Sequence, residues 1–290
     1  MFKAVLETCR PKTLIASVAP MCCVAALEFS FVKANLLLSI SLMMAMILIQ
    51  ILTNWYNDYF DLHQGHDTSL RKGPIRPYQR GELSSSQMRW MLVVFSVFYL
   101  AFLIPIYQVI PRITLILGVL SYFLSIAYSK GNYSLSKLGL SDLFSFLFFG
   151  PVATTVSSYA LTGQFSIPAL MIGLMMGSYA TILLVVNHLR DFDEDRKHGK
   201  TTTVVRFGKT FGMRLVLVLI AFTMIAPWTF FSWTSVNISF MLMGFFIAQL
   251  YQKKFLQAHH TAAYAPLLPL SAQHFVVQTG ILVVLCALYR

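Results

Sequence analysis

Long apolar runs recur along the whole of this 290-residue chain, and they constrain its fold more than any other feature. A run of about 18 or more apolar residues can cross the hydrocarbon core of a bilayer as a helix. Only 11% of the residues are charged, whereas a soluble domain carries about 25%. Because a backbone inside a bilayer must satisfy its own hydrogen bonds, these runs predict an all-α, polytopic membrane protein.

The apolar pattern predicts about nine transmembrane helices in a bundle around a central cavity. If the N-terminus is cytoplasmic, 19 of the 22 Lys and Arg residues fall on the cytoplasmic side of these helices. This asymmetry is the positive-inside rule, and it explains the net charge of +11 without nucleic acid. The predicted helices cover residues 13–32, 35–56, 90–109, 111–128, 140–162, 168–189, 213–232, 236–252 and 273–289.

Acidic residues are rare, and 7 of the 11 lie in two short clusters, residues 54–67 and 187–195. The clusters begin at the cytoplasmic ends of the second and sixth predicted helices. A charged residue at the centre of a membrane helix costs roughly 2.5–3.5 kcal/mol on an insertion scale. Two such clusters at matching helix ends therefore indicate a function for their carboxylates.

Helical spacing places the polar residues of each cluster on one face of its helix. Two such faces across a cavity would offer the oxygen ligands that Mg²⁺ prefers, and Mg²⁺ is usually shared between a few carboxylates and substrate phosphates. We therefore predict a magnesium site that holds a diphosphate. The two faces carry Asn54, Asp58 and Asp61, and Asn187, Asp191 and Asp195.

Basic residues follow both clusters and supply charge for the phosphate oxygens, which Arg contacts through two parallel donors and Lys as a point charge. Solvated helix ends are the alternative explanation for any single residue here. A cation transporter is another alternative, although it favours acids near mid-span and interrupted helices. The basic residues concerned are Arg71, Lys72, Arg76 and Arg80, and Arg196, Lys197, Lys200 and Arg206.

Several motifs resemble those of the UbiA-type superfamily of membrane prenyltransferases, and most closely its 1,4-dihydroxy-2-naphthoate polyprenyltransferase branch, which makes demethylmenaquinone. The resemblance covers residues 10–208, and helices seven to nine contribute only hydropathy and length. The matching pieces are Arg10-Pro11-Lys12-Thr13, Asn57-Asp58-Tyr59-Phe60-Asp61, Gly65-His66-Asp67-Thr68, Gly73-Pro74-x-Arg76, Gly139-Leu140-Ser141-Asp142, Phe148-Phe149-Gly150, and Asn187-x-x-Arg190-Asp191-x-x-x-Asp195 continuing through Gly199-Lys200 to Arg206-x-Gly208.

One departure from the superfamily pattern helps to decide which branch of the family the chain resembles. Many members place an Asp four residues after the equivalent of Asp61, where this chain has Gly65 and its acid comes at Asp67. This position favours the naphthoate branch over the 4-hydroxybenzoate branch. The acceptors left open are 1,4-dihydroxy-6-naphthoate, 4-hydroxybenzoate and homogentisate.

The resemblance implies one membrane-embedded prenyltransferase domain over residues 1–290 and transfer of a polyprenyl group from its diphosphate, with loss of CO₂ and diphosphate. It implies Mg²⁺ as cofactor, membrane lipid as surroundings, and a bacterial cytoplasmic membrane with the active site facing the cytoplasm. The implied metal-binding and catalytic residues are Asp58, Asp61, Asp191 and Asp195. The implied substrate-binding residues are Asn54, Asn57, Asp67, Arg71, Lys72, Arg76, Asn187, Arg190 and Lys200.

Two other groups of residues are predicted to be structural. The cysteines have no metal-ligand spacing and are expected to fill space in helices. The histidines at 259, 260 and 274 lie far in sequence from any acid. We expect neither group to form a metal site.

Overall fold

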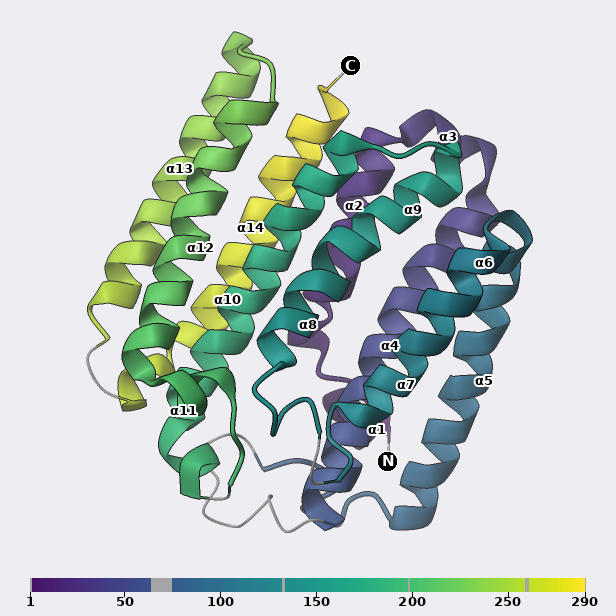
Figure 1. The fold of residues 1–290 in the computed structure, drawn as a ribbon, viewed down its shortest axis with the longest axis vertical. Helices are drawn as coiled ribbons and strands as arrows, with labels where there is room; N and C mark the ends of the chain where they lie inside the picture. The colour runs from purple at the N-terminus through teal and green to yellow at the C-terminus, as the bar shows by residue number, and fades with distance from the viewer. Residues whose placement is uncertain (1, 64–74, 132–133, 198, 259–260, 290) are drawn as a thin grey trace.

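The computed structural model is a bundle of long helices that run roughly parallel or antiparallel to one another (Figure 1). The described part of the chain contains helices and connecting turns and no strand, as the sequence predicts. The two termini lie at opposite ends of the bundle (Figure 1). The described residues are 2–63, 75–131, 134–197, 199–258 and 261–289.

The first half of the chain leads from a short N-terminal helix into two long antiparallel helices, α4 and α5. A π-helical turn, η2, joins α6 to α7. The elements are α1 (Phe2–Thr8), η1 (Pro11–Thr13), α2 (Ile15–Leu27), α3 (Phe29–Ala34), α4 (Leu36–His63), α5 (Ser85–Val109), α6 (Pro111–Ile113), η2 (Thr114–Gly118) and α7 (Val119–Ala127).

The second half is built around α10, the longest helix. Its elements are α8 (Ser141–Leu147), η3 (Phe148–Val152), α9 (Ala153–Thr162), α10 (Ile167–Lys197), α11 (Thr203–Phe207), α12 (Lys209–Phe230), α13 (Ser235–Leu256), η4 (Thr261–Tyr264) and α14 (Leu267–Ala287).

Within the described residues, six helical segments are long and apolar enough to cross a membrane, which confirms the predicted class of protein. Two shorter apolar segments, 15–27 and 111–127, lie within predicted helices as well. The number of nine crossings and the cytoplasmic position of the N-terminus remain predictions. The six segments are α4, α5, α8 to α9, α10, α12 and α14.

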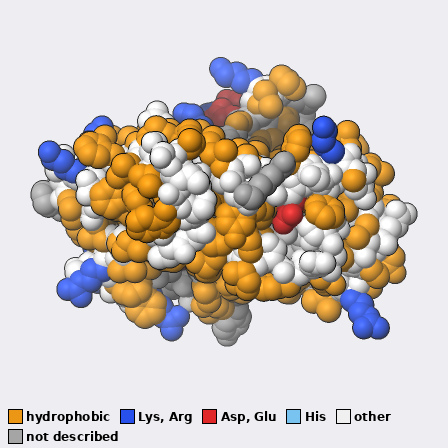
Figure 2. Space-filling model, turned by 90° about the horizontal axis from the view of Figure 1, so that it is seen from above, with side chains coloured by type: hydrophobic (Ala, Val, Ile, Leu, Met, Phe, Trp, Pro, Cys, Tyr) orange, Lys and Arg blue, Asp and Glu red, His pale blue; other side chains and the backbone are white. Residues whose placement is uncertain are grey.

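Seen from the end that carries the C-terminus, the surface is largely covered by apolar side chains, and Lys and Arg side chains project around the outline of the molecule (Figure 2). Two buried apolar cores hold the helices together. One joins α10 to α2, α12, α13 and α14, and the other joins α4 to α1, α5 and the end of α9. Of these six segments α10 is the most enclosed, since 78% of its most apolar 18-residue stretch is buried. The two cores leave a cavity between them.

Glycines bring α10 and the α8–α9 segment into close contact. A Cβ atom at Gly177 would lie 2.3 Å from the backbone oxygen of Phe146, and one at Gly150 would lie 2.5 Å from the backbone oxygen of Gly173. Small residues at helix contacts allow this close approach in membranes. Non-helical dihedrals at Gly150, followed by Pro151, kink the segment at the same point. These contacts hold the end of α8 and η3 against the N-terminal half of α10, and the start of α8 then lies beside its C-terminal half, where Asp142 meets His188.

Candidate active site

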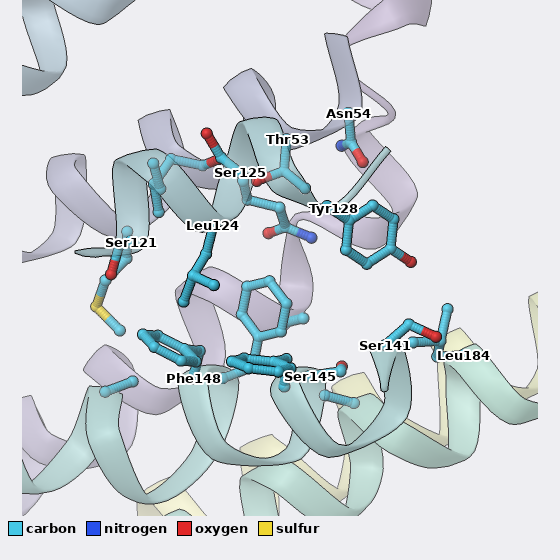
Figure 3. A pocket seen from close by; sticks show the side chains of 18 of the residues that line it. Thr53, Asn54, Ser121, Leu124, Ser125, Tyr128, Ser141, Ser145, Phe148 and Leu184 are labelled. Atoms are coloured by element: carbon cyan, nitrogen blue, oxygen red, sulfur yellow. Dashed lines mark hydrogen bonds between the residues drawn. The ribbon is translucent and has the colours of Figure 1, made fainter. Parts of the chain in front are cut away.

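A cavity of about 450 Å³ lies between α2, α4, α5, α7, the α8–α9 segment and α10. Its polar end lies at the C-terminal ends of α4 and α10, and its apolar end at the junction of α5 and α6 (Figure 1). Figure 3 shows side chains from several of these helices directed into it, among them Asn54 from α4, Tyr128 after α7 and Ser141 from α8. The cavity thus combines an apolar interior with one end rich in polar groups.

The first acidic cluster lies on the last turns of α4. Asn54 and Asn57 line the cavity, whereas Asp58 and Asp61 are almost fully covered, with 1% and 3% of their surfaces exposed. One guanidinium nitrogen of Arg76, Nη1, lies 2.8 Å from Oδ1 of Asp58 and 3.3 Å from Oδ2 of Asp61. Basic side chains therefore compensate both buried carboxylates.

Arg10 adds a second cation to this group. Its guanidinium contacts Asp58 closely and donates a hydrogen bond of 3.2 Å to Oδ1 of Asn57. Asn57 in turn donates to the hydroxyl of Ser129 at 2.8 Å. Arg10 has left-handed backbone dihedrals (φ 52°), which are uncommon for a residue other than glycine. This turn places its side chain at the polar end of the cavity.

The second acidic cluster lies on the last turns of α10 and faces the cavity directly. Asn187, Asp191 and Asp195 all line it, as expected for residues four apart on one helical face. Arg190 forms two hydrogen bonds of 2.6 Å to Asp191 and one of 2.8 Å to Asn187. The Arg190 side chain is mostly buried, and it is not one of the described residues that line the cavity.

Lys200 joins the two clusters. Its Nζ atom lies 2.9 Å from Oδ2 of Asp61. The chain turns back after α10 through Gly199, which has a left-handed φ of 70°, and the backbone N–H of Lys200 donates to the carbonyl of Asp195. A lysine that follows the second cluster thus reaches a carboxylate of the first.

Residues 15–277 match the UbiA prenyltransferase family. The chain belongs to the UbiA prenyltransferase family. Among its relatives, the 1,4-dihydroxy-2-naphthoate octaprenyltransferase of Haemophilus influenzae is 31% identical over 79% of each chain. The enzyme of that name from Escherichia coli is 34% identical over 71% of this chain and 69% of its own. These matches confirm the predicted family and the predicted enzyme class, an aromatic prenyltransferase.

Solved structures of UbiA homologues share the fold. A homologue from Aeropyrum pernix superposes with a TM-score of 0.68 at 15% identity, over 93% of this chain and 97% of its own. A homologue from Archaeoglobus fulgidus, bound to DMAPP and Mg²⁺, superposes with a TM-score of 0.60 at 15% identity, over 96% of this chain and 98% of its own. Those likenesses establish the fold of the UbiA family here.

Most of the predicted site residues that the structure describes lie at the polar end of the cavity. Seen from the cavity, Asp58 and Asp61 lie behind the cations with which they pair, Arg10, Arg76 and Lys200. Arg190 donates hydrogen bonds to Asn187 and Asp191 on its own helix. Asp67, Arg71 and Lys72 lie outside the described residues. Those that line the cavity are Asn54, Asn57, Arg76, Asn187, Asp191, Asp195 and Lys200.

Sequence reasoning missed several cavity residues. Arg10 belongs to a motif that marks the family, but its spacing to Asp58 gives no sign of their contact. His188 and Asp142 form a close pair, 3.2 Å between Nδ1 and Oδ1, and His188 lines the cavity. Their position depends on the packing of α8 against α10, which is a tertiary contact.

The chemistry of the donor set fits Mg²⁺. The two clusters offer carboxylate and amide oxygens, which are hard ligands. No three Asp, Glu, His or Cys side chains among the described residues come close enough to form a metal cage by themselves. This too is compatible with Mg²⁺, because Mg²⁺ usually takes only one or two carboxylates and completes its shell with water and substrate phosphates.

Proposed function

We propose that the protein transfers a polyprenyl group from polyprenyl diphosphate to 1,4-dihydroxy-2-naphthoate in a Mg²⁺-dependent reaction, releasing diphosphate and CO₂ and giving demethylmenaquinone. The observation that carries the proposal is the contact of Lys200 with Asp61, which unites both acidic clusters at the polar end of one apolar cavity. Relatives named 1,4-dihydroxy-2-naphthoate octaprenyltransferase support this acceptor.

The diphosphate is expected to bind at the polar end of the cavity. Arg10, Arg76 and Lys200 converge there and can exchange their carboxylate partners for phosphate oxygens. Mg²⁺ held by Asp58, Asp61, Asp191 and Asp195 would act as a Lewis acid on the diphosphate. Stabilising the charge that develops on a leaving group is usually the largest single catalytic contribution. Asp67, Arg71 and Lys72 remain proposed contacts of the same substrate.

The rest of the cavity suits the prenyl chain and the reactive carbon. Ionisation of the allylic carbon–oxygen bond leaves a cation that must be kept from water until a ring carbon of the naphthoate attacks it. Apolar side chains such as Leu103, Ile106 and Phe148 line the cavity beyond the polar end. Each buried CH₂ of the chain gains about 0.8 kcal/mol on leaving water, so an enzyme within the bilayer can bind the tail without extracting it.

The charge distribution supports a proposal for the orientation in the membrane. We infer that the polar end faces the cytoplasm, as the positive-inside asymmetry predicts. A charged diphosphate then reaches the site from the aqueous side, and the tail stays among the lipid chains. We propose the cytoplasmic membrane of a bacterium as the location of the enzyme.

An acceptor panel tests the function. Purified protein receives radiolabelled octaprenyl diphosphate, Mg²⁺, and one of 1,4-dihydroxy-2-naphthoate, 1,4-dihydroxy-6-naphthoate, 4-hydroxybenzoate or homogentisate. We expect a lipid-extractable product with the first acceptor alone, and its loss with EDTA. Product with a different acceptor would replace the naphthoate assignment. Cation flux in proteoliposomes without product from any acceptor would favour the transporter instead.

Asp191→Ala and Asp193→Ala form a matched pair for the same assay. Asp191 lines the cavity, whereas Asp193 is half exposed and pairs with Lys209 on the surface. Asp191→Ala should lower the rate by about 100-fold or more, since a lost Lewis-acid or oxyanion contact costs on that order. The rate of Asp193→Ala should stay close to that of the unmodified protein. Equal rates in the two variants would remove Asp191 from the site.

A further inference from the structure

A buried histidine and aspartate at the cavity wall have no part in the chemistry of the diphosphate. His188 lies one turn before Asp191 on α10, and Asp142 lies in the first turn of α8. The side chains are about 7% and 6% exposed, and Nδ1 of His188 lies 3.2 Å from Oδ1 of Asp142. The two atoms are close, but their arrangement does not have the geometry of a hydrogen bond.

The pair fixes which ring nitrogen of His188 is available to a ligand. A carboxylate beside Nδ1 favours the tautomer with its proton on Nδ1, because the other tautomer would set a lone pair against the negative charge. Nδ1 is fully covered, so Nε2 is the polar ring atom left toward the cavity that His188 lines. Nε2 then carries a lone pair and can accept a hydrogen bond.

Ser141 provides a second, independent sign of a ligand at this place. Ser141 directly precedes Asp142 in the sequence and lines the cavity, and only 1% of its surface is exposed. Its hydroxyl has no hydrogen-bond partner among the described residues. In Figure 3 its oxygen and the hydroxyl of Tyr128 lie at the same end of the cavity, on facing walls. Buried polar groups are normally paired, so a polar ligand is the expected partner.

We propose that Nε2 of His188 accepts a hydrogen bond from a ring hydroxyl of the aromatic acceptor, with Asp142 as the positioning residue that sets its tautomer. This proposal rests on the proposed function and adds the part of the site that selects a hydroxylated ring. A hydrogen bond given by the hydroxyl raises the electron density of the ring, which favours attack on the allylic carbon. Ser141 is a further contact for the same polar edge.

The placement beside the second acidic cluster supports this role. His188 adjoins Asn187 and lies one turn from Asp191, so an acceptor held there is next to the end of the cavity where the diphosphate is expected. Phe144 and Phe148, which stack on each other, line the same cavity and offer an apolar surface for a flat ring. The ring can thus meet the allylic carbon without crossing the polar end.

Binding of simple naphthoates tests the proposal without any turnover. The dissociation constants of 1-hydroxy-2-naphthoate, 4-hydroxy-2-naphthoate and unsubstituted 2-naphthoate are measured by calorimetry on the purified full-length protein. We expect at least one hydroxylated compound to bind about tenfold more tightly than 2-naphthoate, the size of a net buried hydrogen bond. No preference for either hydroxyl would overturn the proposal.

His188→Ala should bring this ratio close to one while leaving the KM for octaprenyl diphosphate within about twofold. His188→Asn serves if the alanine variant does not fold, because its amide can lie beside Asp142 in the place of Nδ1 but does not reach the position of Nε2. Asp142→Asn should lower the ratio in part, because without the carboxylate the proton of His188 is no longer fixed on Nδ1. A merely structural histidine would leave the ratio unchanged in all folded variants, and that result would refute the assignment.

His274→Gln is the matched control. His274 is also a buried histidine within a helix, but it stacks on Tyr251 in the α13–α14 core and does not line the cavity. Its variant should keep the hydroxyl preference of the unmodified protein. If the unmodified protein shows the preference but makes no prenylated product, the proposed function fails while the hydroxyl site stands, so the two failures are distinguishable.

Discussion

The Nζ atom of Lys200 lies 2.9 Å from Oδ2 of Asp61, across a separation of 139 residues in the chain. Lys200 follows the second acidic cluster and Asp61 belongs to the first. The contact shows that the ends of α4 and α10, which carry the two clusters, lie next to each other. Because Arg76 also contacts Asp61, at 3.3 Å, the carboxylate lies between two cations that a diphosphate could recruit.

Lys200→Met should lower kcat/KM for polyprenyl diphosphate by about 10- to 100-fold, since a hydrogen bond to a charged group is worth on the order of 1.5–3 kcal/mol. Steady-state kinetics with varied diphosphate concentration checks this. Lys209→Met is the matched control, because Lys209 contacts the exposed Asp193 at 3.3 Å and does not line the cavity. A Lys200 variant no worse than the control would separate Lys200 from the site.

Arg76→Lys should also impair the reaction although it keeps the charge. One guanidinium nitrogen of Arg76 contacts both Asp58 and Asp61, and a lysine cannot present the same planar set of donors. We expect a rise in KM for the diphosphate of about tenfold, the value of one good hydrogen bond. Arg112→Lys, in the α6 helix at the other end of the bundle, should have little effect. Similar KM values for both variants would argue against Arg76 as a diphosphate contact.

Gly177→Ala should destabilise the fold. Its Cβ would lie 2.3 Å from the backbone oxygen of Phe146, so α8 and α10 would have to separate. Overpacking of this kind costs about 1–3 kcal/mol, and thermal unfolding in detergent should show a lower Tm. Gly280→Ala on α14, whose Cβ would meet nothing within 4 Å, should not lower it. An unchanged Tm in Gly177→Ala would mean that the two helices are not in tight contact.

A surface cluster at the polar end predicts a dependence of stability on pH. Arg80 binds Glu7 with hydrogen bonds of 3.0 and 2.8 Å and so holds the turn before α5 against α1. The hydrogen bonds from Arg80 hold the pKa of Glu7 below its ordinary value of 4.5. A lowered pKa stabilises the fold above the unfolded pKa, and this contribution is lost as the pH falls through the folded pKa.

The Tm difference between the unmodified protein and Arg80→Met should therefore be largest near pH 7 and shrink below about pH 4.5. Parallel thermal melts across this range measure it. Glu82, which Arg80 also binds and whose pKa is likewise lowered by that hydrogen bond, contributes with the same sign. Acids that do not contact Arg80 titrate alike in both proteins and cancel in the difference. A difference that grows toward low pH would contradict the assigned pairing.

Much of the site could be predicted because its signals are local. Helical spacing alone placed Asn187, Asp191 and Asp195 on one face, and the structure shows all three at the cavity. The same spacing grouped Asp58 with Asn54, but it could not show that Arg10 and Arg76 cover Asp58. Which cation reaches which carboxylate depends on turns between helices, and the left-handed dihedrals at Arg10 have no sequence signal.

The acceptor side of the cavity could not be predicted for a related reason. Asp142 and His188 are 46 residues apart, and each one alone reads as an ordinary residue at a helix end. Their contact exists because glycines allow α8 to approach α10 closely. Likewise, hydropathy predicted the helical segments, but it does not determine how the two apolar cores leave a cavity between them.

Release of the acceptor's carboxylate tests the central claim most directly. Purified protein receives octaprenyl diphosphate, Mg²⁺ and 1,4-dihydroxy-2-naphthoate labelled with ¹⁴C in its carboxyl group. The proposed reaction predicts labelled CO₂ in amounts equal to the prenylated product, with both lost when EDTA is added. A prenylated product that retains the label, or no prenylated product with this acceptor, would contradict it.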